Sequence, residues 1–336
     1  MPGLLPEIDP EGLLEYSVVY TDRSLNHMSQ SFQTVMKDIS ITLKKVYNAD
    51  AVVVVPGSGT FGMEAVARQF ATDKKCLVIR NGWFSFRWTQ IFDKGQIPSK
   101  STVLKARRAK EEKHAPFAPA PIEEVVAAIK NEKPDLVFAP HVETSSGIIL
   151  PVDYIRAVTD AVHSVGGMFV LDCIASGTIW VDMDSCGVDI LISAPQKGWS
   201  ASPCSALVML STLARERIEN TDSSSFACDL LKWLNIMKNY ENGGHAYHAT
   251  MPTDSLRRFR DIMKETEEYG FEKVRAEQEE LGDRVRKMLA DKGFKSVAAK
   301  GFEAPGVVVS YTDDKGIHNG NKFKEIGVQI AAGVPL

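Results

Sequence analysis

The chain has 336 residues, which exceeds the usual size of a single hydrophobic core and predicts one large and one smaller domain. Its 44% hydrophobic and 24% charged content is ordinary for soluble globular proteins, and a formal net charge of −4 gives no indication of a nucleic-acid partner. No apolar stretch approaches the roughly 20 residues of a membrane helix, and the N-terminus lacks the pattern of a secretory signal. A cytoplasmic protein that does not bind membranes is therefore expected.

The cysteines are odd in number, scattered along the chain and mostly set within apolar runs. We interpret them as small buried hydrophobic residues, and we predict neither a disulfide framework nor a metal site. They are Cys76, Cys173, Cys186, Cys204 and Cys228.

The N-terminal part divides into an arm and a helix. Residues 1–25 are rich in proline and show no sustained periodicity, so we predict an arm, with a short extended piece at 16–20. Apolar residues then recur every three or four positions over residues 26–47, which predicts a long amphipathic helix. This helix should open a large domain that spans residues 26–252.

A strand-to-helix turn follows. Four consecutive valines predict a buried strand, and helical composition resumes after the turn Gly57-Ser58-Gly59-Thr60. Such a turn directs free backbone N–H groups and the positive end of a helix at an anion, which favours a phosphate. The glycine spacing fits neither the dinucleotide fingerprint nor the nucleotide P-loop, and a plain capped turn stays an alternative.

Strands and helices then alternate. Strands are expected at 76–79, 102–105, 136–139, 168–172 and 204–210, with helices at 83–92, 121–130 and 152–165. This order predicts a three-layer α/β/α domain with a mostly parallel sheet, in which the turns after the strands gather at one edge.

The last part of the chain predicts a smaller α+β domain over residues 253–336. Before it, helices at 213–219 and 230–240 should close the large domain, and after residue 252 helices are expected at 254–269 and 272–292. Strands at 307–311 and 328–331 and a helix at 319–326 should begin the small domain.

Two opposite charges follow neighbouring predicted strands. Asp172 ends the run 168–172, and Lys197 comes just after an apolar run that ends at Ser193. Ligands of α/β proteins bind outside the carboxyl ends of the strands, so these two residues predict a shared site. A carboxylate for a pyridinium N–H and a lysine for a Schiff base are the protein groups that pyridoxal phosphate requires. The alternative is that Asp172 caps a turn and that Lys197 is a solvated loop lysine.

Six segments together resemble a known family. In chain order they are Gly57-Ser58-Gly59-Thr60 with Met63-Glu64-Ala65, Asn81-Gly82-Trp83-Phe84, Glu143-Thr144-Ser145-Ser146-Gly147, Asp172-Cys173-Ile174-Ala175-Ser176, Ser193-Ala194-Pro195-Gln196-Lys197 and Tyr247-His248-Ala249-Thr250. The chain resembles the class V aminotransferases, which are pyridoxal-phosphate enzymes of fold type I. Within that family it is most similar to the alanine–glyoxylate and serine–pyruvate (serine–glyoxylate) aminotransferases.

The resemblance implies a role for each matching residue. Lys197 would form the Schiff base and Asp172 would hold the pyridine nitrogen. The resemblance also implies a homodimer with shared sites, a small amino acid as donor and a 2-oxo acid such as glyoxylate or pyruvate as acceptor. The other implied contacts are Ser58, Gly59, Thr60 and Gln196 at the phosphate, Phe84 and Ile174 on the two ring faces, Thr144 at the phenolic oxygen, and Tyr247 and Thr250 reaching the phosphate of the neighbouring subunit.

The chain departs from the family pattern at its end. The family usually holds the substrate carboxylate with an arginine late in the small domain, whereas this chain ends at Gly333-Val334-Pro335-Leu336 just before that point, so we expect an incomplete small domain. Arg23 and Arg87 are the candidate substitutes, and structural surface ion pairs are the alternative for both. A lyase such as a cysteine desulfurase of the same fold, or an inactive binding homologue, remain competing functions.

Overall fold

The computed structural model describes residues 24–334, and these form two compact units. Of these residues, unit 1 comprises 24–72 and 179–271, and unit 2 comprises 73–178 and 272–334. The predicted domain boundaries at residues 25 and 252 stay a prediction. The extended piece predicted at 16–20 lies outside the described residues.

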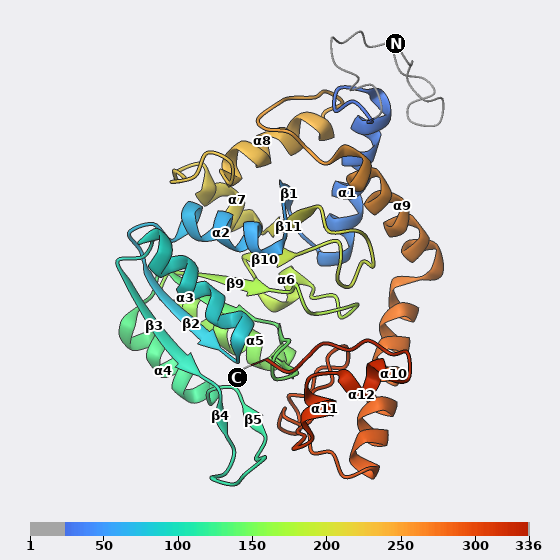
Figure 1. The fold of residues 1–336 in the computed structure, drawn as a ribbon. Coiled ribbons are helices and arrows are strands. Elements are labelled where there is room, and N and C mark those ends of the chain that lie inside the picture. Colours follow the sequence, from blue (N-terminus) through green and yellow to red (C-terminus); the bar gives the residue numbers. More distant parts are fainter. Residues whose placement is uncertain (1–23, 335–336) are drawn as a thin grey trace. The chain divides into compact units, whose positions relative to one another are not determined.

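Unit 1 surrounds three strands with helices (Figure 1). The strands β1 (Ala51–Pro56), β11 (Ser205–Leu210) and β10 (Ile190–Ser193) lie side by side in that order. Because β11 runs antiparallel to both neighbours, β1 and β10 point in the same direction. The helices are α1 (Gln30–Tyr47), α2 (Gly59–Phe70), α6 (Met183–Cys186), α7 (Thr212–Ile218), α8 (Leu230–Glu241) and α9 (Thr253–Tyr269).

The first helix shows how local sequence sets these elements. The Ser29 hydroxyl accepts a hydrogen bond from the Phe32 N–H at 3.1 Å and so caps the start of α1. Asn48 ends the helix in the left-handed conformation, with φ of 52°. The helix begins at Gln30, four residues later than predicted, and its central apolar positions are buried, whereas Met28 is exposed.

Unit 2 contains four parallel strands in the order β9 (Met168–Asp172), β6 (Leu136–Pro140), β2 (Lys75–Arg80) and β3 (Lys100–Lys105). In Figure 1, α3 lies in front of these strands and α4 and α5 lie behind them. The remaining elements of unit 2 are the helices α3 (Trp83–Gly95), α4 (Ile122–Glu132), α5 (Val152–Ser164), α11 (Lys315–His318) and α12 (Asn321–Lys324), with the short strands β4 (Arg107–Arg108), β5 (Phe117–Ala118), β7 (Val142–Glu143) and β8 (Ile148–Ile149). Helix α10 (Phe271–Asp291) starts at the last residue of unit 1.

The prediction of two strands in the C-terminal part is wrong. Residues 307–311 and 328–331 form no strand, and only a single bridge joins Ser296 to Ser310. A strand needs a hydrogen-bonded neighbour, and an alternating pattern in the sequence does not supply one. The helix predicted at 319–326 is also too long, because Gly320 has φ of 78° and separates α11 from α12.

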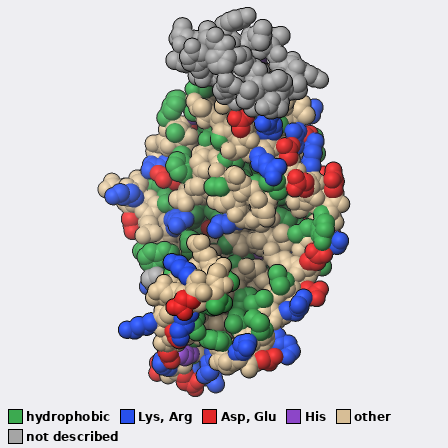
Figure 2. All heavy atoms as spheres, turned by 45° about the vertical axis from the view of Figure 1, so that its right-hand side comes forward, with side chains coloured by type: hydrophobic (Ala, Val, Ile, Leu, Met, Phe, Trp, Pro, Cys, Tyr) green, Lys and Arg blue, Asp and Glu red, His purple; other side chains and the backbone are tan. Residues whose placement is uncertain are grey.

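Three expectations from the composition can be compared with the structure: the distribution of charge, the membrane helices and the cysteines. On the face shown in Figure 2, acidic and basic side chains are interspersed and do not gather into a patch of one sign. Within residues 24–334, no helix has both the length and the hydropathy needed to cross a membrane. All five cysteines are buried and free, which confirms the interpretation of these residues as buried hydrophobic side chains.

Candidate functional site

The turn predicted to bind an anion joins β1 to α2 in unit 1. Gly57 has φ of 124°, and a Cβ atom there would lie 2.7 Å from Cγ of Phe61, so only glycine fits. The Ser58 carbonyl accepts from the N–H groups of Phe61 and Gly62 at 2.9 and 3.3 Å. The Ser58 side chain makes no capping hydrogen bond. Within the described residues, the N–H of Gly59 also has no hydrogen-bond partner. A free hydroxyl and a free N–H at a positive helix end are suited to an anion.

Close packing holds this helix end over the strands. A Cβ atom at Gly62 would lie 2.5 Å from Cβ of Ala206 and 3.3 Å from Cγ2 of Ile192. The absence of a side chain at Gly62 therefore lets the first turn of α2 lie directly on β10 and β11.

Strand register brings Lys197 to the same edge of unit 1 as the anion turn. Pro56, at the end of β1, pairs with Ser205, and Ser193, at the end of β10, pairs with Leu207. Both strands therefore end beside the beginning of β11, and the two turns that follow them leave the sheet on the same side. With neighbouring strands about 4.8 Å apart, the ends of β1 and β10 are roughly 10 Å from each other.

The turn that carries Lys197 is well anchored. The Ser200 N–H donates to the Lys197 carbonyl at 2.9 Å, and the Ala201 N–H donates to the Pro195 carbonyl at 2.9 Å. Trp199 is fully buried, and its ring lies 4.6 Å from that of Trp180. The Lys197 side chain itself is exposed. The turn thus fixes the backbone and leaves the amine accessible.

Gln196, Tyr247 and Thr250 complete the candidate residues of unit 1. The side-chain oxygen of Gln196 is buried and has no hydrogen-bond partner within residues 24–334. Tyr247 and Thr250 are exposed and line a cavity of about 560 Å³. The Tyr247 ring lies 5.7 Å from the imidazole of His27.

In unit 2, Asp172 is the last residue of β9 and is buried. Its Oδ1 accepts from the Ile174 N–H at 2.9 Å, so Asp172 does cap a turn, as the alternative interpretation expects. Its carbonyl accepts from the His141 N–H at 2.8 Å, which joins the ends of β9 and β6. An ionised carboxylate has about four acceptor sites on its two oxygens, so the turn bond does not by itself exclude a second partner.

His141 is a residue that sequence reasoning missed. It is buried, and its Nδ1 lies 2.7 Å from Oγ of Ser176. Burial, with a further effect of the positive charge of Arg275, lowers the pKa of His141 to about 4, so the ring is neutral near pH 7. The signal available in the sequence was a histidine two residues after the strand predicted at 136–139.

Glu143 joins Phe84 to the loop that bears Thr144. The buried Glu143 carboxylate accepts from the Phe84 N–H at 3.0 Å and the Ser85 N–H at 2.8 Å, both in the first turn of α3. It also accepts from the Ser145 hydroxyl at 2.8 Å. A negative charge at the beginning of a helix stabilises it. Phe84 and Thr144 are each half-buried.

The candidate residues fall on both units. Unit 2 brings Phe84, Thr144, Asp172 and Ile174 to the carboxyl ends of its parallel strands. Unit 1 carries Ser58, Gly59, Thr60, Gln196, Lys197, Tyr247 and Thr250. Of the two substitute arginines, Arg23 lies outside the described residues, and the Arg87 guanidinium lies 5.3 Å from the centre of the Phe84 ring.

Solved structures show the same fold. An alanine–glyoxylate aminotransferase from Nostoc sp. matches 89% of this chain and 76% of its own chain, with a TM-score of 0.76 and 19% identity. An aspartate aminotransferase from Thermus thermophilus matches 93% of this chain and 84% of its own chain, with a TM-score of 0.76 and 22% identity. The predicted three-layer fold with a mostly parallel sheet is confirmed.

Curated proteins and a family model give the same result at the level of sequence. Alanine–glyoxylate aminotransferase 1 of Saccharomyces cerevisiae is 27% identical over 268 residues, which cover 74% of this chain and 66% of that protein. The alanine–glyoxylate aminotransferase of Rattus norvegicus is 26% identical over 81% of this chain and 64% of its own length. The chain thus spans slightly less than two thirds of these relatives. The model of the aminotransferase class V family matches residues 12–312. The chain therefore belongs to the class V aminotransferases, the family that the sequence resembles, whose cofactor is pyridoxal 5′-phosphate.

Proposed function

We propose that this protein is a pyridoxal-phosphate-dependent aminotransferase. It would move the amino group of a small amino acid, of the alanine or serine class, to a 2-oxo acid such as glyoxylate or pyruvate. The family supports the reaction type, and the names of the relatives support the substrate class. The observation that carries the proposal is the register of unit 1, in which the anion turn and Lys197 leave the sheet at the same edge.

The residues present fit the cofactor. The free hydroxyl of Ser58 and the free N–H of Gly59 suit its phosphate, with Thr60 in the same turn. Gln196 has a buried side-chain oxygen that has no partner within the described range, and its amide N–H₂ group could donate to the same phosphate. Phe84 and Ile174 would cover the ring, and Thr144 would donate to its phenolic oxygen.

Lys197 and Asp172 would have different roles in the reaction. Pyridoxal phosphate, when bound, supplies an aldehyde that links covalently to an amine and a ring that accepts electron density. Lys197 has an accessible amine, so it would bind the cofactor and, once released, take the proton from the substrate Cα. Asp172 would hold a proton at the ring nitrogen, because a buried carboxylate favours a nearby positive charge.

A cysteine desulfurase is disfavoured by the cysteines. Such an enzyme needs a reactive thiolate, and all five cysteines are buried. Burial raises the pKa of the Cys76 thiol to about 12, and it also raises the pKa values of Cys204 and Cys228. These thiols stay protonated near pH 7.

A homodimer with shared sites is part of the proposal. Tyr247 and Thr250 are exposed beside an open cavity, so a second copy could use them. A cytoplasmic location remains our expectation.

The test is a panel of amino donors, with alanine, serine and aspartate each offered to glyoxylate and to pyruvate. Formation of the new amino acid from alanine or serine would support the proposal. If no donor reacts, an absorbance spectrum before and after borohydride distinguishes an aminotransferase with another substrate from a protein that does not bind the cofactor covalently. Absence of the band of covalently bound cofactor would refute the proposal.

A further inference from the structure

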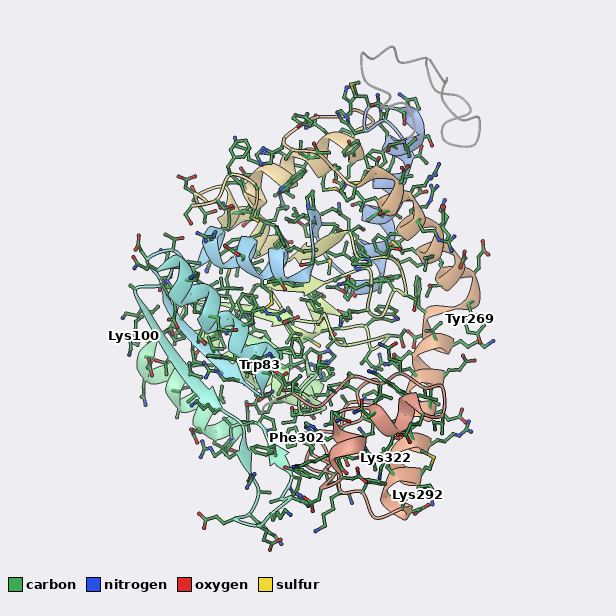
Figure 3. The ribbon with its side chains drawn as sticks, viewed as in Figure 1. Trp83, Lys100, Tyr269, Lys292, Phe302 and Lys322 are labelled. Atoms are coloured by element: carbon green, nitrogen blue, oxygen red, sulfur yellow. The ribbon has the colours of Figure 1, made fainter. Side chains whose placement is uncertain are left out.

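Unit 2 contains a cavity that none of the proposed roles uses. It lies where β2 and β3 end, beside the first turn of α3, and has a volume of about 310 Å³. This size is at the lower end of the range of small-molecule pockets. Figure 3 shows Trp83 at the end of α3 that borders it. The side chains that matter here are those of Arg80, Asn81, Trp83, Phe86, Lys105 and Phe117.

Two basic side chains, those of Arg80 and Lys105, are neighbours in the wall of the cavity. Arg80 and Lys105 are directly paired across β2 and β3, so their side chains lie on the same face of the sheet. Like charges in this arrangement repel each other. Neither side chain forms an ion pair within residues 24–334, and no acidic residue lines the cavity. An anion between them would relieve the repulsion.

The Arg80 guanidinium is held in place, but not all of its N–H groups donate a hydrogen bond. Its Nη2 donates to the Thr89 hydroxyl at 2.6 Å, and it lies 4.4 Å from the centre of the Phe86 ring. Its Nε is buried and donates to no group in the described part of the chain. The side chain is therefore oriented and still has hydrogen-bonding capacity for a ligand.

Asn81 adds further unsatisfied groups. Its side chain is 2% exposed, and neither its Nδ2 nor its Oδ1 has a partner among the described residues. The backbone of Asn81 is fixed, since its N–H donates to Ser85 and its carbonyl accepts from Ser146. Buried polar groups are normally paired, so the Asn81 side chain has unused hydrogen-bonding capacity at the wall of the cavity.

The nearest buried acid does not oppose an anion. Glu143 approaches Gly82 at the cavity, but its two oxygens accept from backbone and hydroxyl donors of Phe84, Ser85 and Ser145. Its charge is thus compensated by these donors and by the helix end. Asp93 lies near enough to Arg80 to act on its charge without forming an ion pair.

The remaining walls are aromatic. Trp83, Phe86 and Phe117 supply flat apolar surfaces, and the Arg108 guanidinium lies 5.5 Å from the centre of the Phe117 ring. We propose that this cavity binds a small carboxylate with a flat apolar body, its charge held by Arg80 and Lys105 and its body by the three rings. This inference does not depend on the proposed aminotransferase activity.

Calorimetric titration of the full, cofactor-loaded protein with phenylacetate tests the inference. Lys105→Met removes the charge and keeps the alkyl chain at an exposed position, and Arg80→Gln removes the second charge. Each change should weaken binding about tenfold, because a hydrogen-bonded ion pair is lost. Lys100→Met is the matched control, since Lys100 is at the other end of β3 and pairs with Glu132 at 2.9 Å (Figure 3). The control should bind phenylacetate as the unchanged protein does.

Several outcomes would overturn the inference. Phenethylamine has the same body and the opposite charge and should not bind, and acetate and inorganic phosphate should bind far more weakly than phenylacetate. Equal binding of acetate or phosphate would mean that the aromatic walls are not used. No binding of phenylacetate, or binding that is unchanged in Lys105→Met, would also refute the site, even if Arg80→Gln fails to fold.

Discussion

The carboxylate of Glu143 lies 2.6 Å from the hydroxyl oxygen of Ser85, although these residues belong to different turns of unit 2. The helix α3 begins after Gly82, which has no side chain to cap it, and Glu143 provides the acceptor from a distant loop. Gly82 is required at this place, since a Cβ atom there would lie 2.1 Å from Oγ of Ser145. One buried acid thus fixes both the Phe84 turn and the Thr144 turn.

We expect Glu143→Gln to lower the thermal unfolding midpoint. The amide keeps the shape but loses the negative charge at the helix end, and one of its groups becomes a donor facing other donors, at a cost of about 1–3 kcal/mol. Circular dichroism during heating measures the change. Glu265→Gln, at an exposed position within α9, is the control and should melt as the unchanged protein does. An unchanged midpoint in Glu143→Gln would mean that the cap is not stabilising.

Lys197→Ala should abolish both the absorbance band of covalently bound cofactor and transamination. The fold should survive, because the Lys197 side chain is exposed and its turn is held by backbone hydrogen bonds. Lys232→Ala, an exposed lysine on α8, should retain both properties. Normal turnover by Lys197→Ala would show that another residue does this work.

Asp172→Asn should retain some cofactor but lose most of the activity. A neutral amide has the size of the carboxylate but cannot stabilise a proton on the ring nitrogen. The turn bond from the Ile174 N–H can be kept, since the amide oxygen also accepts. The turnover number is the measurement, and a rate within a few-fold of that of the unchanged protein would assign the role to another group.

Complementation between two inactive subunits tests whether Tyr247 acts across a dimer. Hybrids of Lys197→Ala with an inactive Tyr247→Ala subunit should have one site with both defects and one site with neither. Such hybrids should recover about half of the normal activity, provided that each site uses Tyr247 of its neighbour. Purified heterodimers without activity would place Tyr247 in the site of its own subunit or outside the site.

The buried His141 should make the protein sensitive to acid. Its pKa is about 4 in the folded state and near 6.5 when unfolded, so the unfolded chain takes up the proton more readily. The stability that depends on neutral His141 is complete above pH 6.5 and decreases as the pH falls toward 4, by about 3 kcal/mol in total. Denaturant unfolding at several pH values should show a shallower decrease for His141→Asn. The variant His245→Asn, at an exposed loop position, should follow the unchanged protein. Equal slopes in all three would exclude His141 as the cause.

The sequence predicts the parts of the fold that depend on local pattern. The helix at 26–47 and the valine strand follow from apolar periodicity and from a continuous apolar run, and α1 and β1 confirm them. The order of strands and turns also led to the expectation that Asp172 and Phe84 lie at carboxyl ends of parallel strands.

Features that depend on pairing could not be predicted in this way. No local signal pairs Arg80 with Lys105, because that pair depends on the register of β2 and β3. The cap from Glu143 joins two loops, and a buried His141 requires knowledge of what surrounds it. The roles of the candidate site residues stay predictions.

The antiparallel strand β11 has a consequence for synthesis of the chain. The strand β1 pairs with β11 in unit 1, and the segment Asp73–Thr178 of unit 2 is made between them. During translation, the apolar strand β1 therefore leaves the ribosome long before its partner exists. An unpaired apolar strand is prone to aggregate, so the nascent chain passes through a vulnerable stage that ends only when residues 205–210 are complete.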